Sequence, residues 1–311
     1  MPASYVHQCV AESACDALSL FDAPSLRSAV LAGSEGPDPL FFSVLSPNIP
    51  KLGSMLHTRK TDDFLLALAD ACKGSALTRA YCCGFFTHYA ADTTFHPFVY
   101  AHSLTEEGSY SSTAHCTLEH QIETLHYRRL GNASGLPVQM RGFMQLRSSE
   151  KDEIARALHA AIARVFPADT PGYAKIRASF EDAVHLCCAL RSESGFKFRA
   201  LGALLRPFHL DAPLHAHMMP AEPPETDIAN DAHAPWASIW TPEQTRTDCF
   251  DDLYAAAVSR AKSLVLTANG YMQGDASYAS LRALHGGLSY DSGLPWQTTC
   301  APKKAPGVRQ G

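Results

Sequence analysis

The sequence predicts an all-α protein. Apolar residues recur at helical spacing along most of the 311-residue chain, a pattern typical of amphipathic helices packed on a core. No segment alternates apolar and polar residues as a half-buried strand does, and no internal repeat of about 20–50 residues is present. Hydrophobic residues make up 46% of the chain, enough to bury a large core. We therefore expect a single all-α domain over residues 1–299, followed by a disordered tail at 300–311.

The first predicted helices lie on either side of a long loop. Apolar residues four positions apart predict a helix over residues 4–21. Residues 33–60 are interrupted by several glycines and prolines and are expected to form a long structured loop. The next helix, over residues 62–74, has two acidic residues in its first turn, Asp62 and Asp63, where they favour the positive end of the helix dipole.

Helical periodicity predicts five further helices, at residues 77–96, 113–130, 148–166, 171–190 and 241–270. Pro97 is expected to end the first of these, because proline lacks the backbone N–H that continues a helix. Pro242 suits the first turn of the last helix, and Gly270 suits its end. Residues 207–242 hold seven prolines and four histidines and are expected to form an ordered loop or a lid.

Composition and charge argue against several classes of function. The formal net charge of −5 disfavours a broad basic surface, so no stable nucleic-acid partner is expected. The N-terminal stretch "MPASYVHQCVAESACDAL" lacks the basic region and apolar core of a secretory signal, and no run of about 18 apolar residues predicts a membrane span. The ten cysteines form no Cys-x-x-Cys pair, so we expect buried, reduced thiols in a cytoplasmic protein.

The segment "GFFTHYAADTTFHPFVYAHS" at residues 84–103 places three metal-ligand side chains in an apolar helix. His88, Asp92 and His96 are four residues apart, so they share one helix face. Imidazole and carboxylate are good ligands for a borderline divalent ion such as Zn²⁺. A single buried polar residue is usually a hydrogen-bonded core group, but burying all three would carry three desolvation costs, which a metal ion offsets.

The next long helix repeats this spacing. His115 and Glu119 are also four residues apart and therefore lie on one face. Two helices that each present a histidine and a carboxylate can converge on a shared core. Helical bundles build multinuclear metal sites in this way.

Three segments carry a resemblance to a known family. "GSEGPDP" at residues 33–39, "GFFTHYAADTTFHPFVY" at 84–100 and "HCTLEHQIE" at 115–123 resemble the zinc-dependent phospholipase C family, whose fold is shared by the S1/P1-type nucleases. The resemblance covers residues 1–130 and implies a multi-helix bundle of the phospholipase C/P1 nuclease type. It implies eight metal ligands in chain order, namely His7, Asp38, His57, His88, Asp92, His96, His115 and Glu119.

The resemblance also implies how these ligands divide. One zinc ion is held by Asp38, His57, His88 and Asp92, a second by His96, His115 and Glu119, and a third by His7 with Asp92 bridging to it. Secreted members complete the third site with an N-terminal Trp, whereas this chain begins "MPASY", so we expect two zinc ions or three. Glu123, one turn after Glu119, is expected either to orient a ligand histidine or to be a solvated acid on the helix face.

The implied function is zinc-dependent hydrolysis of phosphoesters by metal-activated water, with a phospholipid head group or a soluble phosphodiester as substrate. Asp38 is both a ligand and the candidate general base. One alternative is an S1/P1-like nuclease, for which Trp236, Trp240 and Phe208 are available to stack on bases. Another is a non-catalytic helical protein stabilised by zinc. We expect no exposed helix of the aromatic and basic kind that binds membranes.

Overall fold

The computed structural model describes residues 4–43 and 48–298, and its elements confirm the all-α prediction. The predicted tail at 300–311 lies outside the described residues. The elements in chain order are α1 (Ser4–Ala17), α2 (Pro24–Gly33), the 3₁₀ helix η1 (Asp38–Phe42), α3 (Asn48–Thr58), α4 (Thr61–Ala71), α5 (Ala76–Ala101), α6 (Ser112–Arg129), α7 (Arg141–Gln145), α8 (Ser148–Val165), α9 (Tyr173–Leu190), α10 (Phe196–Leu205), the 3₁₀ helix η2 (Arg206–Phe208), α11 (Asp211–His215), β1 (Trp236–Ala237), β2 (Thr245–Arg246), α12 (Phe250–Gln273) and α13 (Tyr278–His285).

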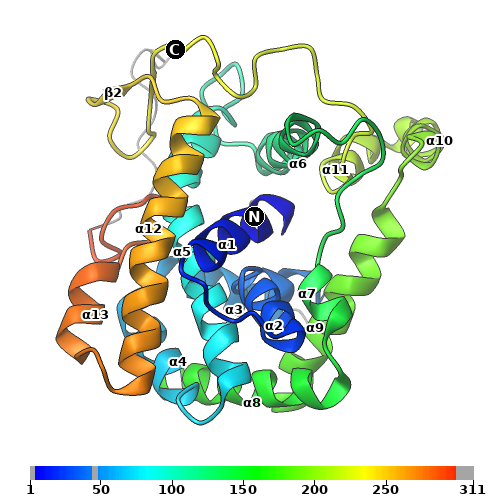
Figure 1. The fold of residues 1–311 in the computed structure, drawn as a ribbon. Coiled ribbons are helices and arrows are strands. Elements are labelled where there is room, and N and C mark those ends of the chain that lie inside the picture. The colour runs from blue at the N-terminus through cyan, green and yellow to red at the C-terminus, as the bar shows by residue number, and fades with distance from the viewer. Residues whose placement is uncertain (1–3, 44–47, 299–311) are drawn as a thin grey trace.

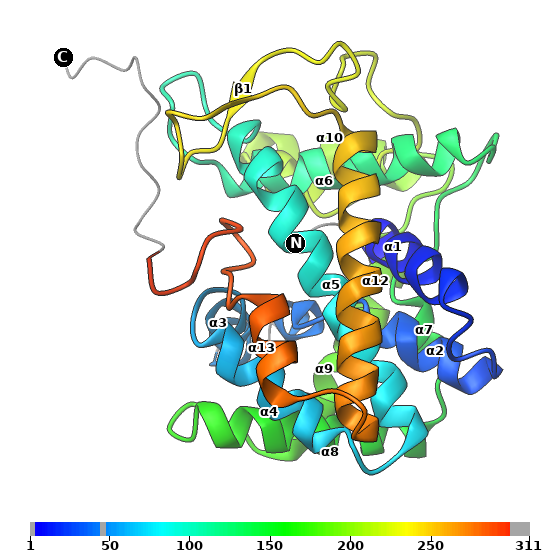
Figure 2. The same ribbon diagram turned by 60° about the vertical axis from the view of Figure 1, so that its left-hand side comes forward.

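The 26-residue helix α5 is the central element. Helix α12 packs along α5, while α1 and α2 cover another of its sides (Figures 1 and 2). Helix α8 crosses one end of the α5–α12 pair, and α6 crosses the other (Figure 2). Within residues 4–43 and 48–298, no helix is both long and apolar enough to cross a membrane.

Helices α2 and α5 approach so closely that only glycine fits at the crossing. A Cβ atom on Gly33 would lie 2.0 Å from the Tyr81 carbonyl oxygen, and a Cβ on Gly84 would lie 2.0 Å from the Val30 carbonyl oxygen. Both neighbours are backbone atoms, which cannot move aside as a side chain can. The crossing brings the segment after α2 against the middle of α5, where His88 lies.

The apolar core is built around the aromatic residues of α5. Phe85, Phe86 and Tyr89 are fully buried there, and Phe85 packs on Phe64 of α4 with the ring centroids 5.7 Å apart. Burying a large apolar side chain stabilises a fold by about 1.5–3 kcal/mol, so this helix holds much of the core energy. All nine cysteines in the described part of the chain are free thiols, and seven of them are buried.

The segment 33–60 is not the long loop that the sequence predicts, because it contains η1 and α3. Two of its prolines lie in the first turns of helices instead of interrupting them. Pro39 occupies the first turn of η1, and Pro50 lies in the first turn of α3. A backbone N–H has no intrahelical partner in a first turn, so proline carries little cost there. The same reasoning explains the unpredicted helix α2, which begins at Pro24.

Pro97 does not end α5, which continues to Ala101. Proline removes the hydrogen bond that the Thr93 carbonyl would otherwise accept. The chain at Gly293 packs against this position, where an added Cβ would lie 2.6 Å from the Thr93 oxygen. The buried side chains of Phe98 and Val99 hold the last turn in the core. Tertiary packing therefore overrides the helix-breaking tendency of proline.

The last long helix begins at Phe250 and ends at Gln273, so its predicted start at Thr241 and end at Gly270 are wrong. Thr241 and Pro242 lie between β1 and β2, which pair Trp236 with Arg246. These strands contradict the prediction of no strand. Within residues 207–242, regular structure is present in η2, α11 and β1. Helix α12 instead begins where Asp252 accepts a hydrogen bond from the Cys249 backbone N–H at 3.1 Å.

Candidate metal centre

Three ligand-type side chains lie along one face of α5, as the sequence predicts. His88, Asp92 and His96 are all buried, with at most 2% of each residue exposed. Their spacing of four residues aligns them along the helix, so Asp92 has a histidine one turn before it and another one turn after it. The remaining candidate ligands approach this row from other elements.

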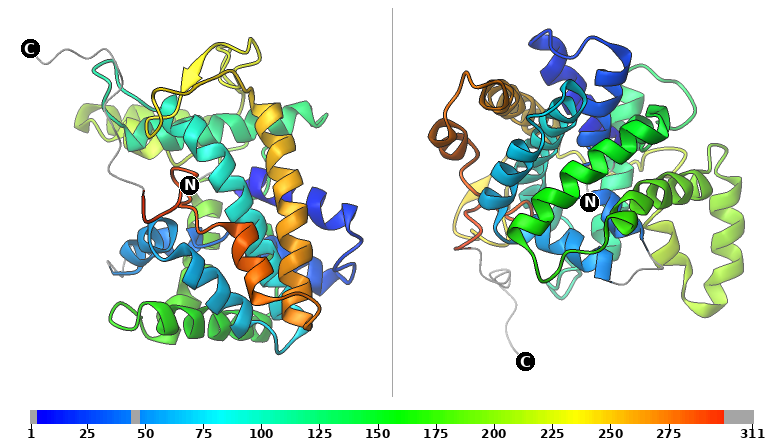
Figure 3. Two further views of the ribbon diagram at one scale, coloured as in Figure 1. Left: turned by 90° about the vertical axis from the view of Figure 1, so that its left-hand side faces the viewer. Right: turned by 90° about the horizontal axis from the view of Figure 1, so that it is seen from below.

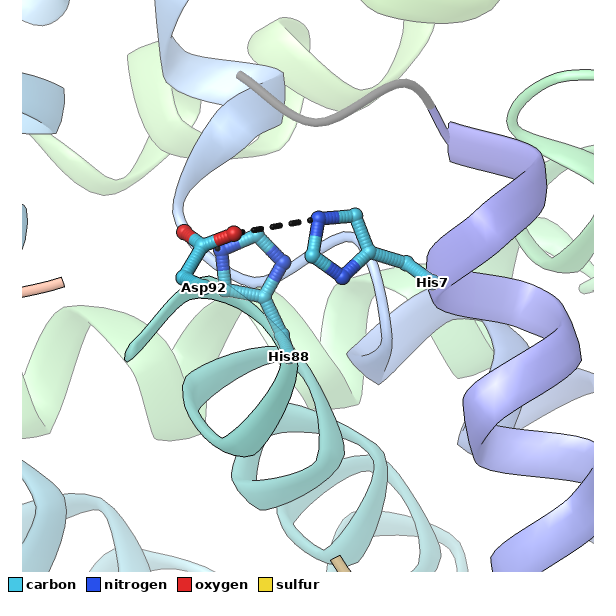
Figure 4. A group of neighbouring side chains, drawn as sticks. All are labelled: His7, His88 and Asp92. Carbon is cyan, nitrogen blue, oxygen red and sulfur yellow. Dashed lines mark ion pairs between the residues drawn. The ribbon is translucent and has the colours of Figure 1, made fainter. Parts of the chain in front are cut away.

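Helix α1 brings His7 to the first half of the row. Its Nε2 lies 3.2 Å from Asp92 Oδ1, while His88 Nε2 lies 2.9 Å from Asp92 Oδ2 (Figure 4). The two imidazole rings stack with centroids 4.2 Å apart. Figure 4 shows both rings directed at the same carboxylate, one from α1 and the other from α5.

A second group forms where η1 and α3 meet α5. His57 Nε2 lies 3.2 Å from Asp38 Oδ1 and 3.6 Å from Asp92 Oδ2. His88 Nε2 is 4.0 Å from the same Asp38 oxygen. Ligand atoms of Asp38, His57 and His88 all lie within 4.8 Å of one another, which is close enough to share one ion.

A third group joins α5 to α6. His115 Nε2 lies 2.9 Å from Glu119 Oε1, and His96 Nε2 lies 3.5 Å from the same oxygen. His96 Nε2 is also 3.8 Å from Asp92 Oδ1. Asp92 thus contacts histidines of all three groups, and the structure brings all eight sequence-predicted ligands together around it.

In three of the histidines, a hydrogen bond to a backbone carbonyl oxygen determines which ring nitrogen is available to bind a metal ion. The Nδ1 atoms of His57, His88 and His96 lie 2.8, 3.0 and 3.0 Å from the carbonyl oxygens of Gly53, Ser34 and Tyr290. A carbonyl oxygen can only accept, so each Nδ1 carries a proton, and Nε2 is the nitrogen that faces the cluster. Metal-ligating histidines typically have this arrangement.

Several nitrogen and oxygen atoms that face the centre of the cluster form no hydrogen bonds with one another, and a metal ion would give them a partner. The Nε2 atoms of these three histidines, Asp38 Oδ1 and both Asp92 oxygens have no hydrogen-bond partner within the described residues. An unsatisfied buried polar group costs about 1–3 kcal/mol, so the cluster is costly unless a ligand satisfies it. Imidazole nitrogens and carboxylate oxygens are donors that zinc accepts.

The charges of the cluster are strongly interdependent. Burial opposes ionisation of His88, but the carboxylates of Asp92 and Asp38 raise its pKa to about 9. Burial would raise the pKa of Asp92, yet His88 and His96 hold it well below its usual range. Burial and the neighbouring His88 lower the pKa of His7. Asp92 is therefore held in the ionised form that binds metal, whereas a metal ion must displace the Nε2 proton of His88 to bind there.

Glu123 contacts the start of α1 rather than a ligand histidine. It accepts hydrogen bonds from the Tyr5 backbone N–H and from Gln139 Nε2, the latter at 3.3 Å. Glu123 is fully buried, which raises its pKa well above the usual value and excludes the solvated alternative. We propose that it positions α1, the helix that carries His7.

Glu35 has a similar position and was missed by the sequence analysis. It accepts hydrogen bonds from Ser4 Oγ at 2.6 Å and Gln8 Nε2 at 3.0 Å, so it also anchors α1. Burial raises its pKa to about 8. The sequence signal that could have identified Glu35 is its position three residues before Asp38, within "GSEGPDP".

A small cavity of about 50 Å³ opens beside the cluster. Asp38 lines it, together with Glu35, Cys116, His120 and His217. Of the predicted ligands, Asp38 alone is among the cavity's lining residues. At this volume the cavity has room for water beside Asp38.

A fourth group of ligand-type residues lies at the start of α12 but is a weaker metal candidate. It consists of His233, Cys249 and Asp252, and His233 and Asp252 are exposed. Its polar atoms are already engaged, because His233 Nδ1 donates to the Thr247 carbonyl oxygen at 3.0 Å and Asp252 accepts from the Cys249 backbone. These hydrogen bonds explain why the three residues lie together at the start of α12 without a metal ion.

Gly36 is required for the position of His88, which leads to a testable prediction. Its φ is +54°, and an added Cβ would lie 2.2 Å from His88 Cδ2. Gly36→Ala is therefore expected to displace the ring and weaken zinc binding roughly tenfold or more, measured by competition with a chelator. Gly135→Ala is the matched control, because Gly135 also has a positive φ but nothing lies within 4 Å of its added Cβ. Equal zinc affinity in both variants would contradict the prediction.

The comparison with protein families gives a match to a zinc-dependent family. The family model described as zinc dependent phospholipase C matches residues 6–174, which is more than half of the chain and includes all eight candidate ligands. The comparisons with curated proteins and with solved structures give no match.

Proposed function

Because this chain belongs to the zinc-dependent phospholipase C family, we propose that it hydrolyses phosphoesters at a multinuclear zinc centre. The single observation that carries the proposal is the convergence of three ligand groups on Asp92, whose carboxylate oxygens lie 2.9–3.8 Å from histidine Nε2 atoms of every group. Zinc ions bound there would supply Lewis acidity, which lowers the pKa of water toward about 7 and neutralises charge on the phosphate oxygens.

The three groups suggest how the ligands divide. In this proposal, one ion is held by Asp38, His57, His88 and Asp92, a second by His96, His115 and Glu119, and a third by His7 with Asp92 shared. The distances between nitrogen and oxygen atoms within each group support this division. The second ion would have three protein ligands, which leaves a position for water or substrate, as in catalytic rather than structural sites.

Asp38 is the proposed general base. Its Oδ1 lies near His57 and has no hydrogen-bond partner in the described residues, and its side chain lines the small cavity. A carboxylate in this position can orient a water molecule and accept its proton while the water attacks phosphorus. The proposed substrate is a phosphodiester, either of a phospholipid head group or of a soluble molecule.

The structure gives the nuclease alternative little support. Stacking on bases requires exposed aromatic faces. Phe208 is exposed, but Trp236 and Trp240 are buried, and Trp240 packs against Tyr100 with ring centroids 4.7 Å apart. The formal charge of −5 also disfavours a polyanionic substrate. We therefore retain phosphoester hydrolysis of the phospholipase C type.

Zinc removal tests the proposed function. Elemental analysis of untagged protein is expected to give two or three zinc ions per chain. Chelation should abolish turnover of a soluble chromogenic phosphodiester, and added zinc should restore it. Zinc binding without turnover of soluble or lipid phosphodiesters would favour a non-catalytic, zinc-stabilised protein. Absence of zinc uptake would show that the buried residues are only a polar part of the core.

A further inference from the structure

Helices α10 and α11 form a hairpin at the edge of the molecule. Figure 1 shows α10 on the side opposite α13, and the view from below in Figure 3 shows the same separation. Among the residues of α10 itself, Gly202 is the one that is buried. The helix packs mainly on α11 and η2, so most of its surface faces outward.

The outward surface is strongly apolar. Phe196 is 69% exposed, Leu204 66%, Phe208 68% and Leu210 54%. Ala200 lies four residues after Phe196 and four before Leu204, and it is also exposed. This spacing places the apolar residues of α10 in one row along the helix, and η2 extends the row. Large side chains that are this exposed and this close together indicate a binding surface.

The opposite side of α10 is tied to α11, so the apolar row is held outward. The rings of Phe198 and His215 stack with centroids 3.8 Å apart, and His215 Nε2 donates to the Phe198 carbonyl oxygen at 2.9 Å. Gly202 lies against the same imidazole, where an added Cβ would be 2.3 Å from Cε1. The row therefore cannot be buried by rotating α10 on α11 without breaking these contacts.

The charged residues within the row are all cations. Residues 196–210 contain three cations, Lys197, Arg199 and Arg206, and no acidic residue, although the chain as a whole carries −5. All three cations are exposed. Arg206 has one acidic neighbour, Asp211, at 3.8 Å. Exposed aromatic and aliphatic residues mixed with cations are typical of helices that lie in the interface of an anionic membrane.

The hairpin also lies close to the candidate metal centre. Helix α11 packs against α6, which carries His115 and Glu119. Leu190 precedes the hairpin and His217 follows it, and both line the cavity that contains Asp38. The cavity is therefore lined by residues on both sides of the hairpin in the chain.

We propose that residues 196–210, which form α10, η2 and the two residues after them, bind the surface of an anionic lipid bilayer. Phe196, Leu204, Phe208 and Leu210 enter the boundary between head groups and acyl chains, and the three cations contact anionic head groups. This proposal corrects the expectation that the chain has no aromatic and basic helix of this kind. It concerns binding and does not require that the metal centre be active.

Vesicle co-sedimentation of the full chain tests the proposal, with phosphatidylcholine vesicles that contain or lack phosphatidylserine. The wild-type protein is expected to bind the phosphatidylserine vesicles and to lose binding at high salt. The double variant Phe196→Asp/Phe208→Asp should weaken binding at least about tenfold, because it replaces two inserted aromatic rings with charges that repel the bilayer. Leu266→Asp is the matched control, since Leu266 is 59% exposed on α12.

Further measurements separate this proposal from the proposed function. Turnover of a soluble phosphodiester should be equal in the wild-type and double-variant proteins, so a failure of catalysis leaves the vesicle result interpretable. Wild-type binding by the double variant, or no binding by the wild type, would overturn the proposal. A concentration-dependent dimer that the double variant abolishes, without vesicle binding, would identify the surface as a contact between copies of the chain and would also overturn it.

Discussion

Asp92→Asn is expected to remove at least one zinc ion per chain and to abolish phosphodiester turnover. Both oxygens of Asp92 face histidines, Oδ1 towards His7 and His96, and Oδ2 towards His57 and His88. Asparagine keeps the size of the side chain but removes the negative charge and replaces one oxygen with a group that only donates. Loss of a shared ligand should lower zinc affinity by more than the roughly 10–100-fold effect of changing a ligand's supporting partner.

The measurement is zinc content by elemental analysis after dialysis, followed by titration with a competing chelator. Asp63→Asn is the control, because Asp63 is exposed on α4, away from the cluster. Circular dichroism should show that both variants keep their helices. Wild-type zinc content and turnover in Asp92→Asn would disprove the shared site.

Asp38→Asn is expected to lower turnover by about 10²–10⁴-fold, the usual contribution of a general base. Zinc content should fall less than turnover, because His57, His88 and Asp92 remain as ligands of the same ion. The change removes the carboxylate that accepts the proton, while the buried amide occupies the same volume. A large loss of turnover with most zinc retained would separate this role from that of Asp92.

Steady-state kinetics at saturating zinc distinguish the two effects, because excess metal compensates for weakened binding but not for a missing base. Asp22→Asn serves as the control, since Asp22 is exposed between α1 and α2. If Asp38→Asn retains full activity under these conditions, then Asp38 is not the base. Activity that recovers fully with added zinc would show that Asp38 acts only as a ligand.

The sequence predicted much of the arrangement of the candidate metal centre because its main signals are local. Positions four residues apart share a helix face wherever the helix lies, so His88, Asp92 and His96 could be grouped without coordinates. The same holds for His115 and Glu119 on α6. The positions of His7, Asp38 and His57 were expected from family resemblance, since nothing in their spacing requires that they meet.

Errors in the predicted helices came from reading prolines without their surroundings. Pro39 and Pro50 lie in first turns, where the missing N–H has no effect, so the expected loop contains helices. Pro97 lies inside α5, where packing of Phe98 and Val99 outweighs the lost hydrogen bond. A proline's cost depends on whether its N–H would have had a partner, and this is known only when the helix boundaries are known.

The sequence by itself determined the helical class and the row of ligands on α5, because helix periodicity is a property of neighbouring residues. Only the tertiary structure decided that Asp92 is shared by three groups, that Glu35 and Glu123 hold α1, and that α10 turns its apolar row outward. Each of these depends on contacts between residues far apart in the chain, and such contacts arise when the packed core fixes how the helices cross.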